Sequence, residues 1–200
     1  MRIILCDNDQ ITKLDLPANV EGSFFLNVPN QEPSLVAINS ENGKWYMISN
    51  ADVVITYNNQ PASKIEVVSH CLYGLKAQGK NYLVYVEDSY DSSICAYKML
   101  DSTITIAYQN ADITYNFKYI GPQSFKIIHN ENGYNLSIIK DALLFKNGFH
   151  LKESTTILHN GDTIFFYGLK IMICNNLIII NNPLGKVSVS SKLQLLDLPY

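Results

Sequence analysis

The residues best suited to chemistry are spread thinly along this chain. Four histidines and four cysteines are present (His70, His129, His150, His159, Cys6, Cys71, Cys95 and Cys174). Zinc sites usually draw their ligands from closely spaced pairs such as Cys-x-x-Cys, and the sequence contains no such pair. It also lacks a Gly-x-Ser-x-Gly nucleophile turn and a Gly-x-x-x-x-Gly-Lys-Ser/Thr phosphate loop. The sequence therefore predicts no catalytic residue, no metal site and no cofactor.

Phosphate recognition is the second chemistry to consider. Arginine, whose planar fork binds phosphate through two hydrogen bonds, occurs once, at Arg2. The other cations are lysines scattered singly along the chain, and the formal net charge is −3. This charge pattern predicts no strong attraction to nucleic acid or to anionic lipid, so we expect no nucleic-acid partner.

Two other site chemistries receive weaker support. Paired carboxylates can hydrolyse glycosides, but the acidic residues fall mainly in expected turns, where solvation is the simpler explanation for them. These residues are Asp7, Asp9, Glu41, Glu131 and Asp162. Thirteen tyrosines on sandwich strands could stack against sugars, so a glycan-binding sandwich stays open as a distant alternative.

The elements that must position these residues are β-strands. Short runs of β-branched and aromatic residues are bounded by Asn, Gly, Pro or Ser, and no long window has a helical period. The clearest stretch is 143–173, where Asn147-Gly148 and Asn160-Gly161 are typical hairpin turns and Gly168 separates the last two strands. We expect this stretch to form the closing antiparallel meander of a β-sandwich.

The chain also repeats itself. Gly43 and Gly133 end similar turns 90 residues apart, 53–58 matches 142–147 at an offset of 89, and 83–86 matches 171–174 at 88. A nearly constant offset indicates two copies of one β-domain, divided at the polar stretch 87–93. We therefore expect an all-β chain of two antiparallel β-sandwiches in tandem. They occupy 1–89 and 92–184, and 185–200 forms a tail or linker.

The second copy resembles the forkhead-associated (FHA) domain. Asn110-Ala111-Asp112-Ile113 answers the family's Asn-Asp-Ile, Lys146-Asn147-Gly148 answers its Asn-Gly, and 160–168 answers its Gly-Asp-x-Ile and final Gly turn. Ala107-Tyr108 stands where the family has Gly-Arg, and Gly121-Pro122-Gln123-Ser124 where it has Ser-x-x-His. The resemblance implies two FHA-like sandwiches whose phosphate-reading residues are replaced.

The narrower resemblance is to the N-terminal region of EssC/YukB-like ATPases, which are membrane-bound FtsK/SpoIIIE-type proteins of type VII secretion in Firmicutes. It rests chiefly on TITIAYQNADITY and ILHNGDTIFFYGLKIMI in the second copy. It implies a soluble fragment at the cytoplasmic face of the membrane, without direct membrane contact and without catalysis. Its partners would be secretion-system proteins or other copies of the parent ATPase.

The same resemblance places a partner-binding group in loops at the apex of the second sandwich. These residues are Tyr108, Gln109, Asn110, Gly121, Gln123, Ser124, Asn147 and Gly148. Losing the family's Arg and Ser removes two charge-assisted hydrogen bonds, which costs on the order of 100-fold in affinity for phosphate. We therefore expect protein docking that does not need phosphothreonine. Lys118 or Lys146 could supply a point charge instead, so a phosphothreonine-peptide-binding pair of domains is the alternative.

Overall fold

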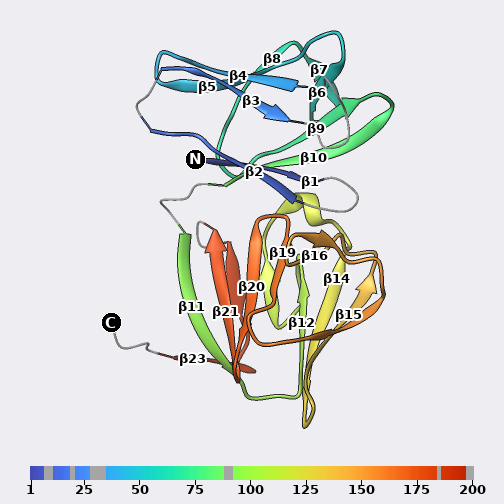
Figure 1. Ribbon diagram of the computed structural model, residues 1–200. Helices are drawn as coiled ribbons and strands as arrows, with labels where there is room; N and C mark the ends of the chain where they lie inside the picture. Colours follow the sequence, from blue (N-terminus) through green and yellow to red (C-terminus); the bar gives the residue numbers. More distant parts are fainter. Residues whose placement is uncertain (7–10, 19–20, 28–34, 88–91, 184–185, 197–200) are drawn as a thin grey trace. The chain divides into compact units, whose positions relative to one another are not determined.

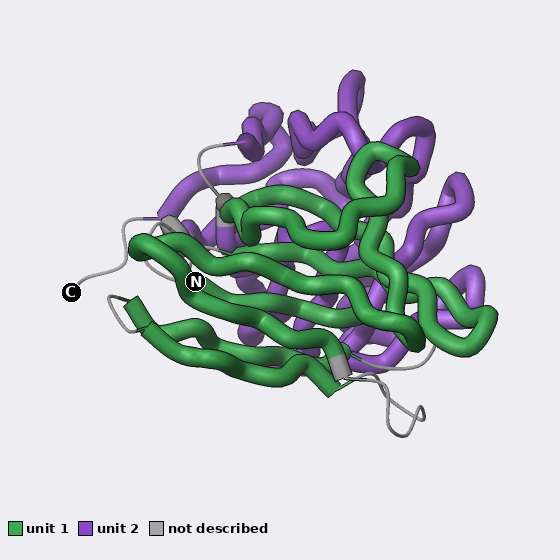
Figure 2. Tube along the Cα trace, turned by 90° about the horizontal axis from the view of Figure 1, so that it is seen from above, with its two compact units in different colours: residues 1–90 green, residues 91–200 purple. Residues whose placement is uncertain are grey.

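The computed structural model describes residues 1–6, 11–18, 21–27, 35–87, 92–183 and 186–196. The chain divides into two compact units, Met1–Tyr90 and Asp91–Tyr200 (Figures 1 and 2). In the described residues, each unit consists of two β-sheets, and the single helical segment is a short 3-10 turn, η1 (Lys118–Ile120). None of the described helical segments has the length and hydropathy needed to span a membrane. The expected all-β fold class is confirmed.

Unit 1 is an antiparallel sandwich of sheets ordered β2-β1-β10-β9-β6-β7 and β3-β4-β5-β8. Its strands are β1 (Arg2–Cys6), β2 (Ile11–Asp15), β3 (Ser23–Asn27), β4 (Leu35–Glu41), β5 (Lys44–Ile48), β6 (Val53–Tyr57), β7 (Gln60–Ala62), β8 (Lys64–Glu66), β9 (Leu72–Ala77) and β10 (Lys80–Glu87). Successive strand residues face opposite sides, so Trp45 and Met47 of β5 are buried between the sheets. Ile3 and Leu5 of β1 belong to the same core.

Unit 2 has sheets ordered β17-β16-β19-β20-β21-β11-β23 and β18-β15-β14-β12-β13-β22. Its strands are β11 (Ser92–Met99), β12 (Thr103–Ala107), β13 (Ile113–Tyr115), β14 (Ser124–Asn130), β15 (Gly133–Lys140), β16 (Phe145–Lys146), β17 (Phe149–His150), β18 (Thr155–Leu158), β19 (Thr163–Phe166), β20 (Leu169–Cys174), β21 (Leu177–Pro183), β22 (Val187–Val189) and β23 (Leu193–Leu196). Ile104 and Ile106 of β12 point inward, and the Phe125 and Phe166 rings meet edge to face at 5.2 Å.

The repeated sequence landmarks fall on strands with equivalent places in the two units. The hairpin β4-β5 corresponds to β14-β15, the pair β6-β7 to β16-β17, and the pair β9-β10 to β19-β20. The next strand in the sheet differs in origin. It is β1, at the start of unit 1, but β21, near the end of unit 2. The second unit is therefore a strand-level circular permutation of the first.

The segment after residue 184, which the sequence led us to expect as a tail or linker, contributes to both sheets of unit 2. β22 pairs with β13 at the edge of one sheet, and β23 pairs with β11 at the edge of the other. Leu193 is buried, and the Ser190 amide donates to the Asp112 carbonyl at 2.8 Å. These strands have three and four residues, which is too short for a periodic pattern to reveal them.

The expected closing meander also takes a different path. Asn147-Gly148 is a true hairpin turn, because both residues have positive φ (53° and 89°) and β16 pairs with β17. Asn160-Gly161 instead connects the two sheets, since β18 pairs with β15 and β19 pairs with β20. The second tight hairpin turn is Tyr167-Gly168, where even the tyrosine adopts positive φ (49°).

Candidate functional site

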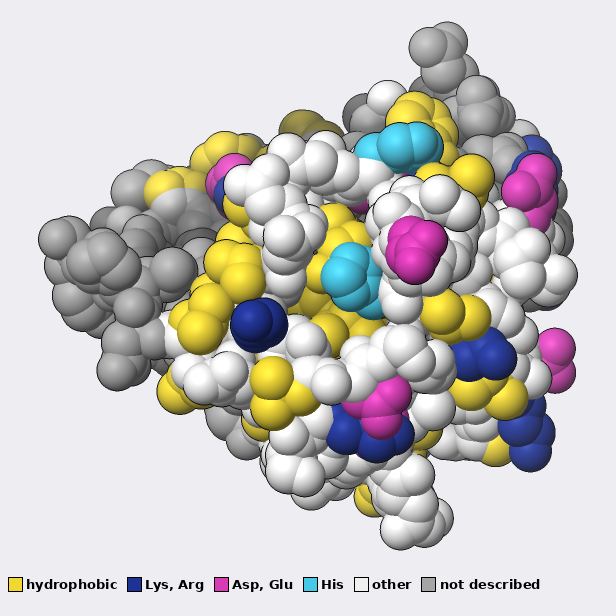
Figure 3. Space-filling view, turned by 90° about the horizontal axis from the view of Figure 1, so that it is seen from below, with side chains coloured by type: hydrophobic (Ala, Val, Ile, Leu, Met, Phe, Trp, Pro, Cys, Tyr) yellow, Lys and Arg dark blue, Asp and Glu magenta, His cyan; other side chains and the backbone are white. Residues whose placement is uncertain are grey.

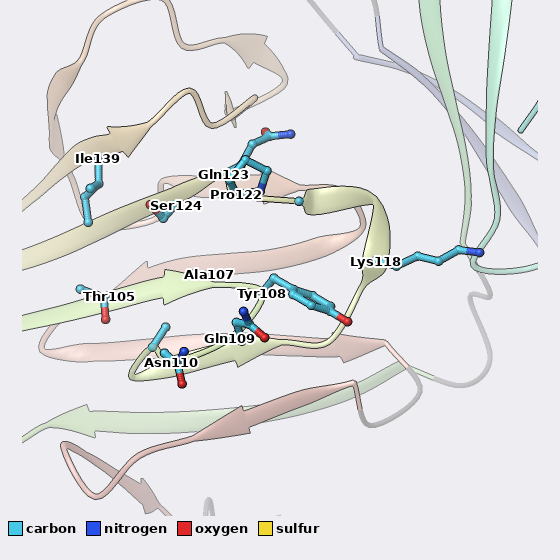
Figure 4. Close-up of a pocket in the computed structure, with 12 residues that line it drawn as sticks. Thr105, Ala107, Tyr108, Gln109, Asn110, Lys118, Pro122, Gln123, Ser124 and Ile139 are labelled. Carbon is cyan, nitrogen blue, oxygen red and sulfur yellow. The ribbon is translucent and has the colours of Figure 1, made fainter. Parts of the chain in front are cut away.

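A pocket of about 600 Å³ opens at one end of the β12-β14-β15 sheet, entirely within unit 2 (Figure 4). Its floor is the outer face of these strands, and its walls are the loop after β12 and the segment after η1. The lining residues are Thr105, Ala107, Tyr108, Gln109, Asn110, Ala111, Lys118, Gly121, Pro122, Gln123, Ser124 and Ile139. Six of the eight predicted binding residues are among them: Tyr108, Gln109, Asn110, Gly121, Gln123 and Ser124.

The first wall of the pocket is fastened at its base by Asp112. One carboxylate oxygen of Asp112 accepts hydrogen bonds from the Thr105 amide (2.9 Å) and hydroxyl (3.0 Å), and the Asp112 amide donates to that hydroxyl (3.2 Å). These bonds close the loop 106–111, in which Asn110 adopts positive φ (55°). Burial raises the pKa of Asp112, but the Thr105 hydrogen bonds and nearby Lys192 outweigh it and hold the pKa below its usual value.

The second wall depends on Gly121 and Gln123. Gly121 ends η1 with φ 58° and ψ −134°, a conformation that essentially only glycine adopts. The Gln123 carboxamide accepts from the Leu143 amide and donates to the Tyr167 hydroxyl, both at 2.8 Å. Figure 4 shows that this side chain points away from Ser124 and Tyr108. Gln123 therefore positions the wall and joins it to the 141–144 loop.

Ile139 reaches the pocket through a β-bulge. In the pairing of β14 with β15, Ser124 lies opposite Lys140 while Phe125 lies opposite Ile138, so Ile139 is an extra residue. Bulges redirect side chains, and the Ile139 side chain is 54% exposed at the pocket rim. This position could not be predicted from the sequence, because a bulge depends on the register of the neighbouring strand.

The pocket lining is polar but nearly uncharged. Among the described residues that line it, Lys118 is the one with a charged side chain, and this side chain extends away from the other labelled side chains (Figure 4). The Lys118 ammonium lies 5.0 Å from the centre of the Tyr119 ring. In unit 1, Arg2 donates to the Asp15 carboxylate at 2.6 and 3.2 Å and lies 3.7 Å from Glu87. The single arginine is thus held in ion pairs on its own unit.

Asn147 and Gly148, the other two predicted residues, lie apart from the pocket. The Asn147 amide donates to the Thr163 carbonyl, and the Asn147 side-chain oxygen accepts from the Thr163 amide, at the start of β19. Tyr167, which accepts a hydrogen bond from the pocket residue Gln123, lies just after the end of β19. The two turns are therefore separated by the length of β19, about 13 Å for four residues.

The Asn147 turn encloses a small polar cluster. Asp162 accepts from the Asn147 side chain (2.7 Å) and the His159 amide (2.8 Å), and pairs with Lys146 (2.9 Å). Burial raises the pKa of Asp162, and these three partners together lower it below its usual value. The Asn147 and Lys146 side chains are thus engaged within their own unit.

Charged side chains are dispersed elsewhere as well. On the face seen in Figure 3, Lys and Arg side chains are separated by uncharged surface, and several adjoin acidic side chains. Across the described residues, no three His, Cys, Asp or Glu side chains come together as a metal-binding group.

Comparison with solved structures gives a match over nearly the whole chain. No family model matches the chain, and no curated protein matches it. A solved structure described as the N-terminal FHA domain from EssC, a component of the bacterial type VII secretion apparatus, superimposes with a TM-score of 0.63. The match covers 94% of this chain and 95% of that chain, at 12% sequence identity. At this identity the match identifies the fold, and the chain therefore has an FHA-like β-sandwich fold.

Proposed function

We propose that this chain is a non-catalytic protein-interaction module of a type VII secretion ATPase, and that it docks through the pocket on unit 2. The observation that carries the proposal is the convergence of six predicted apical residues on one pocket. The similarity of the whole fold to a domain of a secretion component supports the choice of system. We propose the cytoplasmic side of the membrane as its location and other secretion-system proteins as its partners.

The walls of the pocket are held in place before a partner binds. Asp112 and Gln123 each tie a wall to a neighbouring strand or loop, so little backbone ordering is required when a partner binds. Uncharged groups such as Tyr108, Gln109 and Ser124 suit the backbone and polar side chains of a protein loop. A partner segment without phosphate would therefore leave no buried charge unpaired.

The alternative is a phosphothreonine-peptide-binding module, and Lys118 is the residue that keeps this alternative open. Its ammonium is a flexible point charge that could turn toward a phosphate bound in the pocket. The two hypotheses are distinguished by amide chemical shifts of the labelled full chain. These are recorded with a phosphothreonine peptide library and with the same library without phosphate. We expect no phosphate-dependent shift at Tyr108 or Ser124. Such shifts, abolished by Lys118→Ala, would establish the alternative.

The docking itself is tested by photo-crosslinking in cells that carry the secretion system. A photoreactive residue at exposed Gln109 is expected to capture another secretion-system protein. The same residue at Glu153, an exposed position of unit 2 outside the pocket lining, is the matched control. Equal capture at the two positions, or no capture at Gln109, would refute docking through the pocket.

A further inference from the structure

Strand β3 of unit 1 has an edge that lacks the residues which usually discourage pairing with another strand. Among the described residues it is the terminal strand of its sheet, and its sequence, Ser-Phe-Phe-Leu-Asn, contains neither a charge nor a proline (Figure 1). The other terminal strands of unit 1 each contain a residue that discourages strand pairing: Lys13 in β2, Pro61 in β7 and Lys64 in β8. β3 alone among the four lacks this protection.

The backbone of β3 is oriented for pairing at this edge. The Ser40 amide donates to the Gly22 carbonyl at 2.9 Å, and these residues lie directly opposite each other when the β3-β4 register is extended by one position. Bonded and non-bonded pairs alternate in an antiparallel ladder, so Phe24 and Leu26 also bond to β4. The amide and carbonyl groups directed at the open edge belong to Ser23, Phe25 and Asn27.

The side chains of β3 complement those of a second, antiparallel β3. Centred on Phe25, such a pair places Phe25 opposite itself, Ser23 opposite Asn27, and Phe24 opposite Leu26. Polar residues then face polar ones and apolar residues face apolar ones, with no like charges opposed. Phe25 is 61% exposed in the single chain, and this pairing would cover it.

We propose that two copies of this chain associate through antiparallel β3-β3 pairing, which joins their β3-β4-β5-β8 sheets across a two-fold axis. Three opposed pairs would exchange two backbone hydrogen bonds each, about six in all. The outer stripe Ile48-Ala37-Phe25 would continue into the second copy, because these residues lie side by side in the register. Such an interface is smaller than a standard one, so the dimer is weak, in the micromolar range. The β3-β3 association does not involve the pocket on unit 2.

Sedimentation of the full chain across the micromolar range tests the association. We expect reversible dimerisation that Phe25→Lys weakens about tenfold or more, because it places two ammonium groups opposite each other. Val54→Lys is the matched control, since Val54 is also an exposed apolar residue (40%) but lies on β6, inside its sheet. A wild-type chain that stays monomeric, or a Phe25→Lys variant that dimerises as tightly as wild type, overturns the proposal.

Disulfide trapping tests the register of the pair. Opposed residues in a bonded pair have Cα atoms about 5.5 Å apart, within disulfide range. Phe25→Cys is therefore expected to give a covalent dimer under mild oxidation, with wild type as the blank for the native cysteines. Ser23→Cys and Asn27→Cys should cross-link only when mixed. Absence of the Phe25→Cys dimer, or cross-linking of Ser23→Cys alone, contradicts β3-β3 pairing.

Discussion

The Gln123 and Tyr167 side chains are joined by a 2.8 Å hydrogen bond, in which the Gln123 amide donates to the tyrosine hydroxyl. This bond connects a pocket wall to a hairpin turn of the opposite sheet. The Tyr115 hydroxyl donates to the Tyr167 carbonyl, also at 2.8 Å, and so helps to hold Tyr167 in its positive-φ conformation. The shape of the pocket is thus held by contacts between a lining residue, Gln123, and residues outside the lining.

Replacing Gln123 by alanine should loosen this junction. The half-buried Leu143 amide loses its side-chain acceptor, and we expect a loss of about 1–3 kcal/mol in unfolding free energy. Amide hydrogen exchange should rise in the 141–144 loop. Gln109→Ala is the control, since this exposed pocket glutamine should change stability by less than about 0.5 kcal/mol. Equal stability of the two variants would show that Gln123 has no positioning role.

Asp112→Asn should alter the acid stability of unit 2. The folded pKa of Asp112 lies below its unfolded value, so its contribution is present above about pH 4 and is lost as the pH falls through the folded pKa. The variant should be about 1–2 kcal/mol less stable at pH 7, and this difference should shrink below pH 4. Urea unfolding at several pH values measures it. A difference that is constant from pH 7 to pH 2 would contradict the assignment.

Gly121→Ala should strain the turn after η1. Apart from its own neighbours in the chain, no described residue has an atom within 4 Å of an added Cβ, so the expected loss of about 1–3 kcal/mol comes from the backbone conformation alone. Gly22→Ala serves as the control, because its Cβ would meet Phe24 at an ordinary 3.5 Å. Thermal unfolding of both variants tests this. A Gly121→Ala protein as stable as the control would mean that the turn relaxes to another conformation.

Two leucines of the final strand, β23, differ in exposure and can be compared by substitution. Leu193 is 5% exposed and Leu195 is 56% exposed, although both belong to β23. Leu193→Ala should cost about 2–5 kcal/mol through lost burial and a residual cavity, whereas Leu195→Ala should cost far less. Denaturant unfolding distinguishes the two variants. Similar small losses would indicate that β23 is not a fixed part of unit 2.

Much of the fold was predictable because it depends on local chemistry. Alternation in Thr103–Ala107 gives a strand with two buried isoleucines, and Asn-Gly with positive φ gives the hairpin at Asn147. The 88–90 residue offsets fall on equivalent strands because the repeated turns have the same place in each unit.

What the sequence could not supply depends on register and crossover. The FHA resemblance led us to expect Asn147 beside Tyr108 at the apex of the second sandwich, but which end of β19 the Asn147 turn adjoins is decided by strand pairing. Asp112 was visible only as part of a family motif. Its role in fastening the pocket wall needs Thr105 seven residues away and Ser190 seventy-eight residues away.

The permuted strand gives the two units different folding histories during synthesis. In unit 1 the first strand, β1, can pair with β2 as soon as β2 follows it, but it must wait for its other neighbour, β10, because Arg2 pairs with Glu87. In unit 2 the equivalent strand, β21, directly follows its neighbour β20 through the turn between Cys174 and Leu177. The strand that must wait for a distant partner is instead β11, whose Ser92 pairs with Pro183. Loop closure over such spans is the slow step of β-sheet formation. Each unit can therefore close only after nearly all of its own residues have left the ribosome, and unit 1 can do so while unit 2 is still being made.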